Sequence, residues 1–347
     1  MRDVIPAGWT TSRRLLKRGA FDPGGAKRVI VSGVQALILA AGLGTRLWPL
    51  TADRAKPAVP FIGRPLVASC AALLAKHGFA RAVVNTHYRA ESVRAALADA
   101  PLAIDFSHEE QILGTAGAIA FAIESGRLDR DQPLLVLNGK LSTDLDLRAA
   151  MDAHVQSRAA VTMVLRTNAA RERFKEVLTD GDRVTGFGAM IPESARARLF
   201  TGVHVLSPEV MAAIPRGVET DTIQNTYPPF IAAGRVHAHV DDGGRWWELS
   251  TLERYVALHS HAAALGLCGP QVLGPRATIA ASAKIGRAVL WEDAVIGEHA
   301  DVDEVVVGAG AAVRPGEVLR RTVVIRRDLT GDVERGVVDG DRVLVQI

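Results

Sequence analysis

Apolar and polar positions alternate along residues 34–160 in blocks that predict strands and helices taking turns. Short apolar runs predict strands at 35–41, 81–85, 102–106, 134–138 and 161–165. Apolar residues at helical spacing predict helices at 65–77, 90–99, 116–125 and 145–157. This alternation is typical of an α/β fold whose sheet is mixed but mostly parallel. Ligands of such sheets bind beyond the carboxyl ends of the strands, so the loops 42–46, 85–88 and 138–144 are expected to share one crevice.

A different pattern, with a period of six residues, runs through residues 268–326. Alanine stands two positions before many of its aliphatic residues, which are Leu273, Ile279, Ile285, Leu290, Ile296, Val302, Val307, Val313, Leu319 and Ile325. The period predicts a short left-handed parallel β-helix of about three coils. Residues 327–347, which contain Asp339-Gly340, are expected to form a closing hairpin or tail. Residues 1–32 are expected to form an irregular N-terminal extension.

Composition narrows the class of protein. The chain of 347 residues is 48% hydrophobic and 23% charged, which is typical of a globular protein with an aliphatic core. A net charge of +3 without a basic stripe argues against nucleic-acid binding. No apolar run reaches the ~18 residues of a membrane span, so no membrane partner is expected. Cys70 and Cys268 are too few for a disulfide framework or a zinc site, which favours a cytoplasmic location.

The first predicted strand runs into a glycine-containing loop that suits phosphate. Gly42 and Gly44 allow a tight turn and a close approach of backbone N–H groups to a ligand. Thr45 and Arg46 add donors for phosphate oxygens, and Lys56 adds a further cation. The alternative is an ordinary strand-to-helix loop, because the dinucleotide fingerprint and the P-loop are both incomplete here. We interpret the loop as a polyphosphate site.

Residues 35–57 resemble the signature of the sugar-1-phosphate nucleotidyltransferases, the NDP-sugar pyrophosphorylases. Residues 221–229 are most similar to the mannose-1-phosphate guanylyltransferase branch. The resemblance implies a Rossmann-like nucleotidyltransferase domain over 33–260, followed by hexapeptide repeats over 268–326. It implies that a nucleoside triphosphate, such as GTP, and a sugar 1-phosphate are converted to an NDP-sugar and pyrophosphate. Arg46 and Lys56 are the catalytic residues that it implies, and Mg²⁺ is the implied cofactor.

The resemblance also implies the binding residues. Those for the nucleotide are Ala40, Ala41, Gly42, Gly44, Thr45, Arg46, Gly114, Thr115, Asn138 and Gly139, and those for the sugar are Glu176, Thr201 and Gly202. Gly114 and Gly117 also open a predicted helix, so we expect free backbone N–H groups there for a ligand. Ser142 or Thr143 is expected to cap the helix that follows the strand 134–138.

The predicted metal site departs from the family's pattern. Lys140 stands where the family has a metal-binding aspartate, and Glu248 stands where it has the second one. Glu248 and Asp144 remain as candidate metal ligands, and a cation at position 140 repels Mg²⁺. Two interpretations therefore stay open: an active nucleotidyltransferase, or a catalytically weak or inactive regulatory homologue that binds nucleotide. Either is expected to form a homo-oligomer or hetero-oligomer through the β-helix.

Overall fold

The computed structural model describes residues 33–168, 174–188, 197–333 and 335–347, so the predicted extension 1–32 lies outside the described residues. The described residues form two compact units. The sheet unit comprises residues 33–42 and Val67–Glu248, and the C-terminal unit comprises Leu43–Leu66 and Leu249–Ile347. The division cuts across the predicted range 33–260, because Leu43–Leu66 packs with the C-terminal residues.

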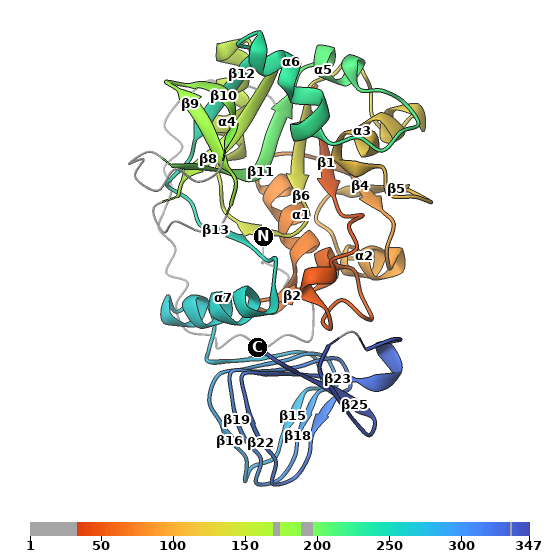
Figure 1. Cartoon of the computed structure of the whole chain (residues 1–347), viewed down its shortest axis with the longest axis vertical. Coiled ribbons are helices and arrows are strands. Elements are labelled where there is room, and N and C mark those ends of the chain that lie inside the picture. Colours follow the sequence, from red (N-terminus) through yellow and green to blue (C-terminus); the bar gives the residue numbers. More distant parts are fainter. Residues whose placement is uncertain (1–32, 169–173, 189–196, 334) are drawn as a thin grey trace. The chain divides into compact units, whose positions relative to one another are not determined.

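A nine-stranded mixed sheet organises the sheet unit, in the order β5-β4-β1-β6-β11-β8-β12-β10-β9. Its strands are β1 (Gln35–Leu39), β4 (Arg81–Thr86), β5 (Ala103–His108), β6 (Leu134–Asn138), β8 (Val161–Thr167), β9 (Glu176–Asp180), β10 (Arg183–Gly188), β11 (Arg198–Leu206) and β12 (Val236–Val240). Strands β5, β4, β1 and β6 lie side by side and pair in parallel (Figure 1). Each strand predicted from an apolar run is present.

The expectation of a mostly parallel sheet holds for only part of it. Strand β11 pairs antiparallel with both β6 and β8, and β10 pairs antiparallel with β9 and β12. On this side of the sheet, parallel pairing joins β8 to β12. A short connection explains one of these pairs, since β9 and β10 form a hairpin around Asp180 and Gly181, and a tight hairpin requires antiparallel strands.

Helices connect the strands of the sheet unit. They are α1 (Leu66–Lys76), α2 (Ala90–Ala96), α3 (Gly114–Glu124), α4 (Leu147–Ser157), α5 (Pro208–Ala213) and α6 (Tyr227–Ala232), with the short π-helix η3 (Thr222–Thr226). The expected caps of α4, Ser142 and Thr143, lie instead in strand β7 (Leu141–Thr143), which pairs with β13 (Trp246–Glu248). Asp146 is the N-cap, and its carboxylate accepts two backbone N–H groups of the first turn at 2.9 and 3.1 Å.

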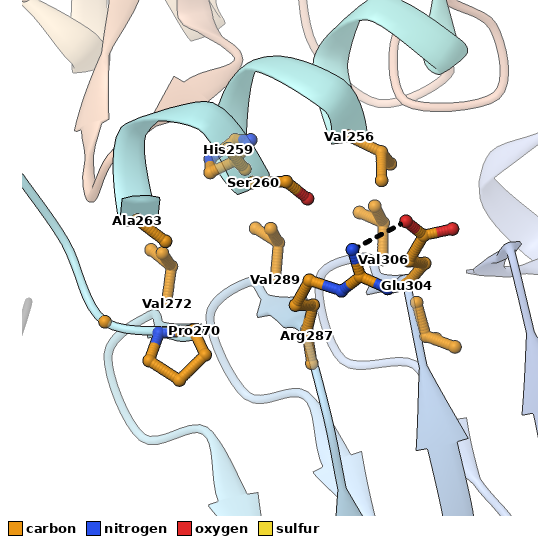
Figure 2. A pocket seen from close by; sticks show the side chains of 13 residues that line it. Val256, His259, Ser260, Ala263, Pro270, Val272, Arg287, Val289, Glu304 and Val306 are labelled. Atoms are coloured by element: carbon orange, nitrogen blue, oxygen red, sulfur yellow. Dashed lines mark ion pairs between the residues drawn. The ribbon is translucent and has the colours of Figure 1, made fainter. Parts of the chain in front are cut away.

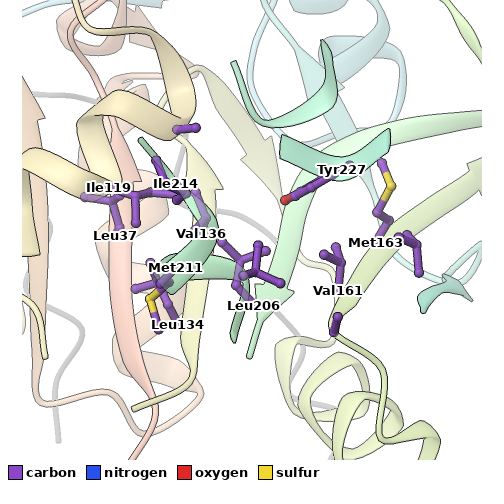
Figure 3. Packing of buried hydrophobic residues seen from close by; sticks show 14 of the residues in the cluster. Leu37, Ile119, Leu134, Val136, Val161, Met163, Leu206, Met211, Ile214 and Tyr227 are labelled. Atoms are coloured by element: carbon purple, nitrogen blue, oxygen red, sulfur yellow. The ribbon is translucent and has the colours of Figure 1, made fainter. Parts of the chain in front are cut away.

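Apolar side chains from the helices cover the strands and form the core of the sheet unit. Figure 3 shows Ile119 of α3 and Met211 of α5 packed against Leu37, Leu134 and Val136 of β1 and β6. The same buried cluster includes Tyr227, whose hydroxyl shares a hydrogen bond of 2.5 Å with His204 Nδ1. Burial lowers the pKa of His204 to about 3, so this pair is neutral inside the core at neutral pH.

Three parallel sheets form most of the C-terminal unit. They are β14 (Gln271–Leu273), β17 (Ala288–Leu290), β20 (Val305–Val307) and β23 (Thr322–Arg326); β15 (Thr278–Ile279), β18 (Val295–Ile296) and β21 (Ala312–Val313); and β16 (Lys284–Ile285), β19 (Asp301–Asp303) and β22 (Val318–Arg320). Pairing repeats every 17 residues, from Val272 to Val289, Val306 and Val323.

The six-residue period marks the buried side chains of these sheets. The cluster that they form includes Leu290, Ile296, Val302, Val307, Val313 and Leu319, and the interposed Ala294, Ala300 and Ala311. Ile279 is an exception to the expected pattern, because it is 37% exposed. It lies on β15, an edge strand of its sheet, and therefore has a neighbouring strand on one side only.

The remaining elements of the C-terminal unit come from both ends of its sequence. Strands β24 (Val337–Asp339) and β25 (Arg342–Gln346) form an antiparallel hairpin, and β25 also pairs with β23. The other elements are η1 (Thr45–Leu47), η2 (Lys56–Ala58), β2 (Pro60–Phe61), β3 (Arg64–Pro65), α7 (Leu252–Ala264) and η4 (Arg327–Leu329). Among the described residues, no helix has both the length and the apolar character needed to cross a membrane.

Candidate functional site

Three parallel strands of the sheet unit end in register at one edge of the sheet. Leu39, the last residue of β1, pairs with Asn85 of β4 on one side and with Asn138 of β6 on the other. The residues that follow β1 and β6 are therefore neighbours, which is the position where open α/β sheets bind ligands. The predicted loops 85–88 and 138–144 thus begin at the same edge.

A chain of buried hydrogen bonds links this edge to the segment that precedes α3. The backbone N–H of Ala40 donates to Asn85 Oδ1 at 2.6 Å, and Asn85 Nδ2 donates to Glu109 Oε1 at 2.7 Å. Glu109 Oε2 accepts the backbone N–H of Leu113 at 3.1 Å. Glu109 is 1% exposed; burial raises the pKa of its carboxyl, and hydrogen bonds from Asn85 and Leu113 oppose this shift. Two predicted nucleotide-binding segments, at Ala40 and at 113–115, are thus held together by one carboxylate.

We expect Glu109→Gln to lower the free energy of unfolding by about 2 kcal/mol, because a buried donor then faces another donor. Rotating the Asn85 amide by half a turn would relieve a contact between two donors, but the Ala40 N–H would then lose Asn85 Oδ1 as its acceptor. Thermal unfolding followed by circular dichroism should show a Tm lower by roughly 5 °C. Glu110→Gln is the matched control, since Glu110 is the exposed neighbour. Equal Tm values for the two variants would contradict the structural role of the carboxylate.

The N-terminus of α3 differs from the expectation of backbone N–H groups left free for a ligand. The N–H groups of Ala116 and Gly117 donate to the Thr220 carbonyl at 2.9 and 3.1 Å. The N–H of Thr220 donates in turn to the Leu113 carbonyl at 2.8 Å. Gly114 has a φ of 72°, and a Cβ there would lie 2.6 Å from the Thr220 oxygen. Gly114 therefore makes room for Thr220, and Gly117 makes room for the Val218 carbonyl, 2.9 Å from where its Cβ would lie, so packing accounts for glycine at both positions.

Thr115 belongs to the same internal arrangement. Its hydroxyl donates to Asp221 Oδ2 at 3.0 Å and accepts the backbone N–H of Thr222 at 2.8 Å. Asp221 also caps the π-helix η3 by accepting two backbone N–H groups of its first turn. The side chain of Thr115 thus holds the segment 220–222 against α3, and its predicted role in nucleotide binding stays a prediction.

Two glycines at the strand edge allow unusually close approaches. A Cβ at Gly139 would lie 2.8 Å from the Leu39 carbonyl oxygen, which accepts the Gly139 N–H at 2.8 Å. A Cβ at Gly202 would lie 2.4 Å from Asn138 Nδ2, and the φ of Gly202 is 81°. Gly202 lies where the pairing of β11 shifts register between Phe200 and His204. The structure therefore brings Asn138 and Gly139, predicted for the nucleotide, next to Gly202, predicted for the sugar; these binding roles stay predictions.

The predicted sugar residues Thr201 and Glu176 are buried in the sheet unit. Thr201 is 1% exposed and its hydroxyl donates to the Val164 carbonyl at 2.7 Å. Its own carbonyl accepts the indole N–H of Trp246 at 2.8 Å. Glu176 is 2% exposed and begins β9. Thr201 thus stabilises the sheet with its polar groups, and a sugar-binding role for either residue stays a prediction.

An ion pair occupies the predicted metal position. Lys140 Nζ lies 2.5 Å from Glu248 Oε1, and the side chains are 31% and 5% exposed. Pairing of β7 with β13 places Leu141 opposite Glu248, which brings the preceding lysine within reach of the carboxylate. Asp144, the other candidate ligand, forms an ion pair of 2.9 Å with Arg245.

This donor set does not fit Mg²⁺. Magnesium requires oxygen ligands in near-octahedral geometry, whereas here an ammonium group lies against one carboxylate and a guanidinium group against the other. Across the described residues, no group of three or more His, Cys, Asp and Glu side chains is arranged to hold a metal.

The predicted triphosphate residues of the C-terminal unit lie on a short segment of turns. Gly44, with a φ of 71°, precedes η1, and a Cβ there would lie 2.9 Å from the Cβ of Lys56. Thr51 closes the same turn, since its hydroxyl donates to the Gly44 carbonyl at 3.2 Å. Lys56 is 7% exposed, whereas Thr45 and Arg46 are exposed. Glycine at 44 thus allows the close approach of Lys56 to the loop.

Sequence reasoning missed several residues that organise this part of the molecule. Asn85 and Glu109 carry the buried network, and Asp221 fixes the segment that covers α3. The available signal was weak: Asn85 ends an apolar strand, and Glu109 follows another predicted strand. A polar residue at the end of a buried strand is a candidate for the ligand edge, but its partners come from distant parts of the chain.

The amino-acid sequence of this chain is similar to that of several known proteins. The nucleotidyl transferase family matches residues 35–264. The mannose-1-phosphate guanylyltransferase of Mycobacterium tuberculosis is 30% identical over 303 residues, covering 83% of this chain and 83% of the relative. The mannose-1-phosphate guanyltransferase of Aspergillus fumigatus is 27% identical over 341 residues, covering 86% and 92%. The UTP–glucose-1-phosphate uridylyltransferase of Synechocystis is 28% identical over 239 residues, covering 64% and 61%.

A solved structure shares the fold. The crystal structure of HddC from Yersinia pseudotuberculosis superposes with a TM-score of 0.56 at 21% identity, covering 65% of this chain and 98% of that chain. The strand edge and the glycine loop fall within residues 35–264, which match the nucleotidyl transferase family. The chain therefore belongs to the sugar-1-phosphate nucleotidyltransferase family.

Proposed function

We propose that this protein binds a nucleoside triphosphate, GTP in first place, and a sugar 1-phosphate, as a mannose-1-phosphate guanylyltransferase-type protein with weak Mg²⁺-dependent turnover. Support for the substrates comes from two relatives named for this activity, which match 83% and 86% of the chain. The proposal of weak Mg²⁺-dependent turnover rests on the 2.5 Å ion pair between Lys140 and Glu248. The ammonium group neutralises the Glu248 carboxylate, so the predicted metal position lacks the negative charge that would attract Mg²⁺.

The reaction proposed for the family's chemistry is a direct displacement. A phosphate oxygen of the sugar 1-phosphate would attack the α-phosphorus of the triphosphate in line, and pyrophosphate would leave as the new P–O bond forms. Arg46 and Lys56 are the predicted cations for the negative charge that develops on the phosphates. Lys140 would add a fixed positive charge at the strand edge, where it opposes entry of Mg²⁺ but not binding of phosphate.

The same ion pair supports a second candidate, a regulatory homologue that binds nucleotide without converting it. Measuring pyrophosphate release with a panel of triphosphates and sugar 1-phosphates separates the two. Release above the background rate with one sugar 1-phosphate supports the enzyme, and nucleotide binding without release supports the regulator. The Synechocystis relative is named a uridylyltransferase, so the panel must include UTP as well as GTP.

GTP is expected to bind with little dependence on Mg²⁺. Isothermal titration should give dissociation constants for GTP with EDTA and with Mg²⁺ that agree within about threefold, because the fixed ammonium of Lys140 takes the place of a metal charge. ATP, CTP and UTP serve as the comparison for the base. If no triphosphate binds at a ligand concentration of ~1 mM, the binding free energy is weaker than ~4 kcal/mol. That result would overturn the proposed function.

We further infer that the three parallel sheets of the C-terminal unit are the left-handed parallel β-helix that the six-residue period predicts. The support is the 17-residue register, in which each coil contributes one strand to each sheet. Small and aliphatic side chains fill its interior, as the stacking of repeats requires. Oligomerisation through this region stays a prediction.

A further inference from the structure

The segment that carries Arg46 and Lys56 packs inside the C-terminal unit. Leu43–Leu66 is grouped with Leu249–Ile347, although 182 residues of the sheet unit, Val67–Glu248, separate them in the sequence. Contacts between this segment and the C-terminal strands must therefore fix the position of Lys56. Two sets of contacts do so, one through Arg54 and one through α7.

Arg54 joins the segment to the coil that follows β17. Its Nη2 lies 2.5 Å from Glu292 Oε1 and 2.7 Å from Asp53 Oδ2. The guanidinium carbon lies 4.4 Å from the centre of the Trp291 ring, a cation–π arrangement. Burial alone would lower the pKa of Arg54, but hydrogen bonds to both carboxylates raise it above its ordinary value. The Arg54 and Glu292 side chains are 16% and 29% exposed, so water screens their charges only in part and the ion pair holds Arg54 in place.

Helix α7 ties the following residues to the same coil. Trp291, fully buried, donates its indole N–H to Tyr255 Oη at 3.2 Å, and Tyr255 Oη donates to the Pro60 carbonyl at 2.7 Å. His259 Nε2 accepts the backbone N–H of Ile62 at 3.3 Å, while its Nδ1 faces the Tyr255 carbonyl at 2.9 Å. Burial lowers the pKa of His259 to about 4, so its Nε2 is an acceptor at neutral pH.

The helix is itself fixed on the parallel sheet. Figure 2 shows Val256, Ser260 and Ala263 of α7 facing Val289 and Val306, with which they line a small pocket. An ion pair of 3.1 Å between Arg287 and Glu304 lies at the same place. The parallel strands, α7 and the segment 53–62 thus form one continuous set of contacts.

We propose that Arg54 is a positioning residue for the triphosphate: held by Trp291 and Glu292, it fixes the turn in which Lys56 follows two residues later. The C-terminal strands therefore set the affinity for nucleotide through this arginine. The inference deepens the proposed function and rests on it, since Lys56 must bind phosphate for its position to matter.

The decisive variant is Arg54→Met, which keeps the aliphatic stem and removes the guanidinium group. Arg276→Met is the matched control: Arg276 pairs with Asp293, the neighbour of Glu292, but both side chains are exposed, at 71% and 48%. Isothermal titration should show a GTP dissociation constant about tenfold larger for Arg54→Met, the equivalent of one charge-assisted hydrogen bond of ~1.4 kcal/mol. The control should stay within about twofold of the unmodified chain.

Hydrogen exchange tests the position of the turn without any ligand. The hydrogen bonds from Ala58 N–H to Ala55 (2.8 Å) and from Val59 N–H to Lys56 (3.1 Å) define η2, so exchange in residues 55–59 should become faster in Arg54→Met only. If Arg54→Met fails to fold, Glu292→Gln replaces it and should show the same changes, at about threefold in affinity.

Each result decides the inference. GTP binding that Arg54→Met leaves unchanged, or that Arg276→Met weakens equally, would overturn the positioning role while the proposed function stands. Faster exchange throughout the chain, with a lower Tm, would assign Arg54 a general structural role instead. No GTP binding by the unmodified chain would overturn the proposed function and this inference with it.

Discussion

Lys140→Asp is expected to raise the rate of pyrophosphate release by about 100-fold and to make it dependent on Mg²⁺. The substitution replaces an ammonium by a carboxylate beside Glu248, so the local charge changes by two units. At ~5 Å and an effective dielectric constant near 20, each unit pair contributes roughly 3 kcal/mol. In the unmodified chain, the ammonium of Lys140 pairs with Glu248 and repels a divalent cation. In the variant, two carboxylates face the same position and attract the cation.

A readout independent of activity follows from the same charges. Two neighbouring carboxylates repel each other without a cation, so the Tm of Lys140→Asp should rise when Mg²⁺ is added. At a Mg²⁺ concentration of ~100 times its dissociation constant, binding adds ~2.7 kcal/mol to the free energy of unfolding. The Tm of the unmodified chain should not respond to Mg²⁺ in this way.

Lys140→Met is the control for loss of the ammonium alone. It leaves the buried Glu248 carboxylate without that cation, a change that costs about 3–5 kcal/mol for a well-buried pair. We therefore expect a lower Tm and no gain in Mg²⁺-dependent rate. If the unmodified chain turns over at an ordinary ~10 per second and Lys140→Asp changes neither rate nor Mg²⁺ dependence, the ion pair does not determine activity.

The strands and helices of residues 34–160 could be predicted because their signals are local. The apolar run at 134–138 is β6 with identical ends, and the run at 35–41 contains β1. Local patterns do not define which strands become neighbours, so the antiparallel pairing of β11 with β6 was not predicted. The six-residue period also has a local signal, and it marks side chains that are buried together in the C-terminal unit.

Lys140 was singled out because the resemblance places a metal-binding aspartate at its position. The structure pairs this lysine with Glu248, and the metal role of the position stays a prediction. The backbone N–H groups at the start of α3 were expected to be free for a ligand, but Ala116 and Gly117 donate to the carbonyl of Thr220, more than 100 residues away in sequence. A glycine that faces a ligand and one that faces another backbone segment have the same local sequence.

Gly114 allows residue 220 to pack closely against the start of α3. Gly114→Ala should lower the free energy of unfolding by about 4 kcal/mol, in two parts. Alanine at positive φ costs ~1 kcal/mol, and the new Cβ, 2.6 Å from the Thr220 oxygen, must push that segment away. The displacement breaks three backbone hydrogen bonds of Thr220, with Leu113, Ala116 and Gly117, each worth ~1 kcal/mol.

Gly126→Ala separates the two parts of this effect, because Gly126 lies just beyond the other end of α3 with nearly the same backbone. Its φ is 70°, and a Cβ there meets no heavy atom of the described residues within 4 Å, apart from its chain neighbours. Thermal unfolding should therefore show a Tm lower by roughly 3 °C for Gly126→Ala and by roughly 10 °C for Gly114→Ala. Similar Tm values would mean that the contact between α3 and residue 220 contributes little, and would contradict the packing explanation of Gly114.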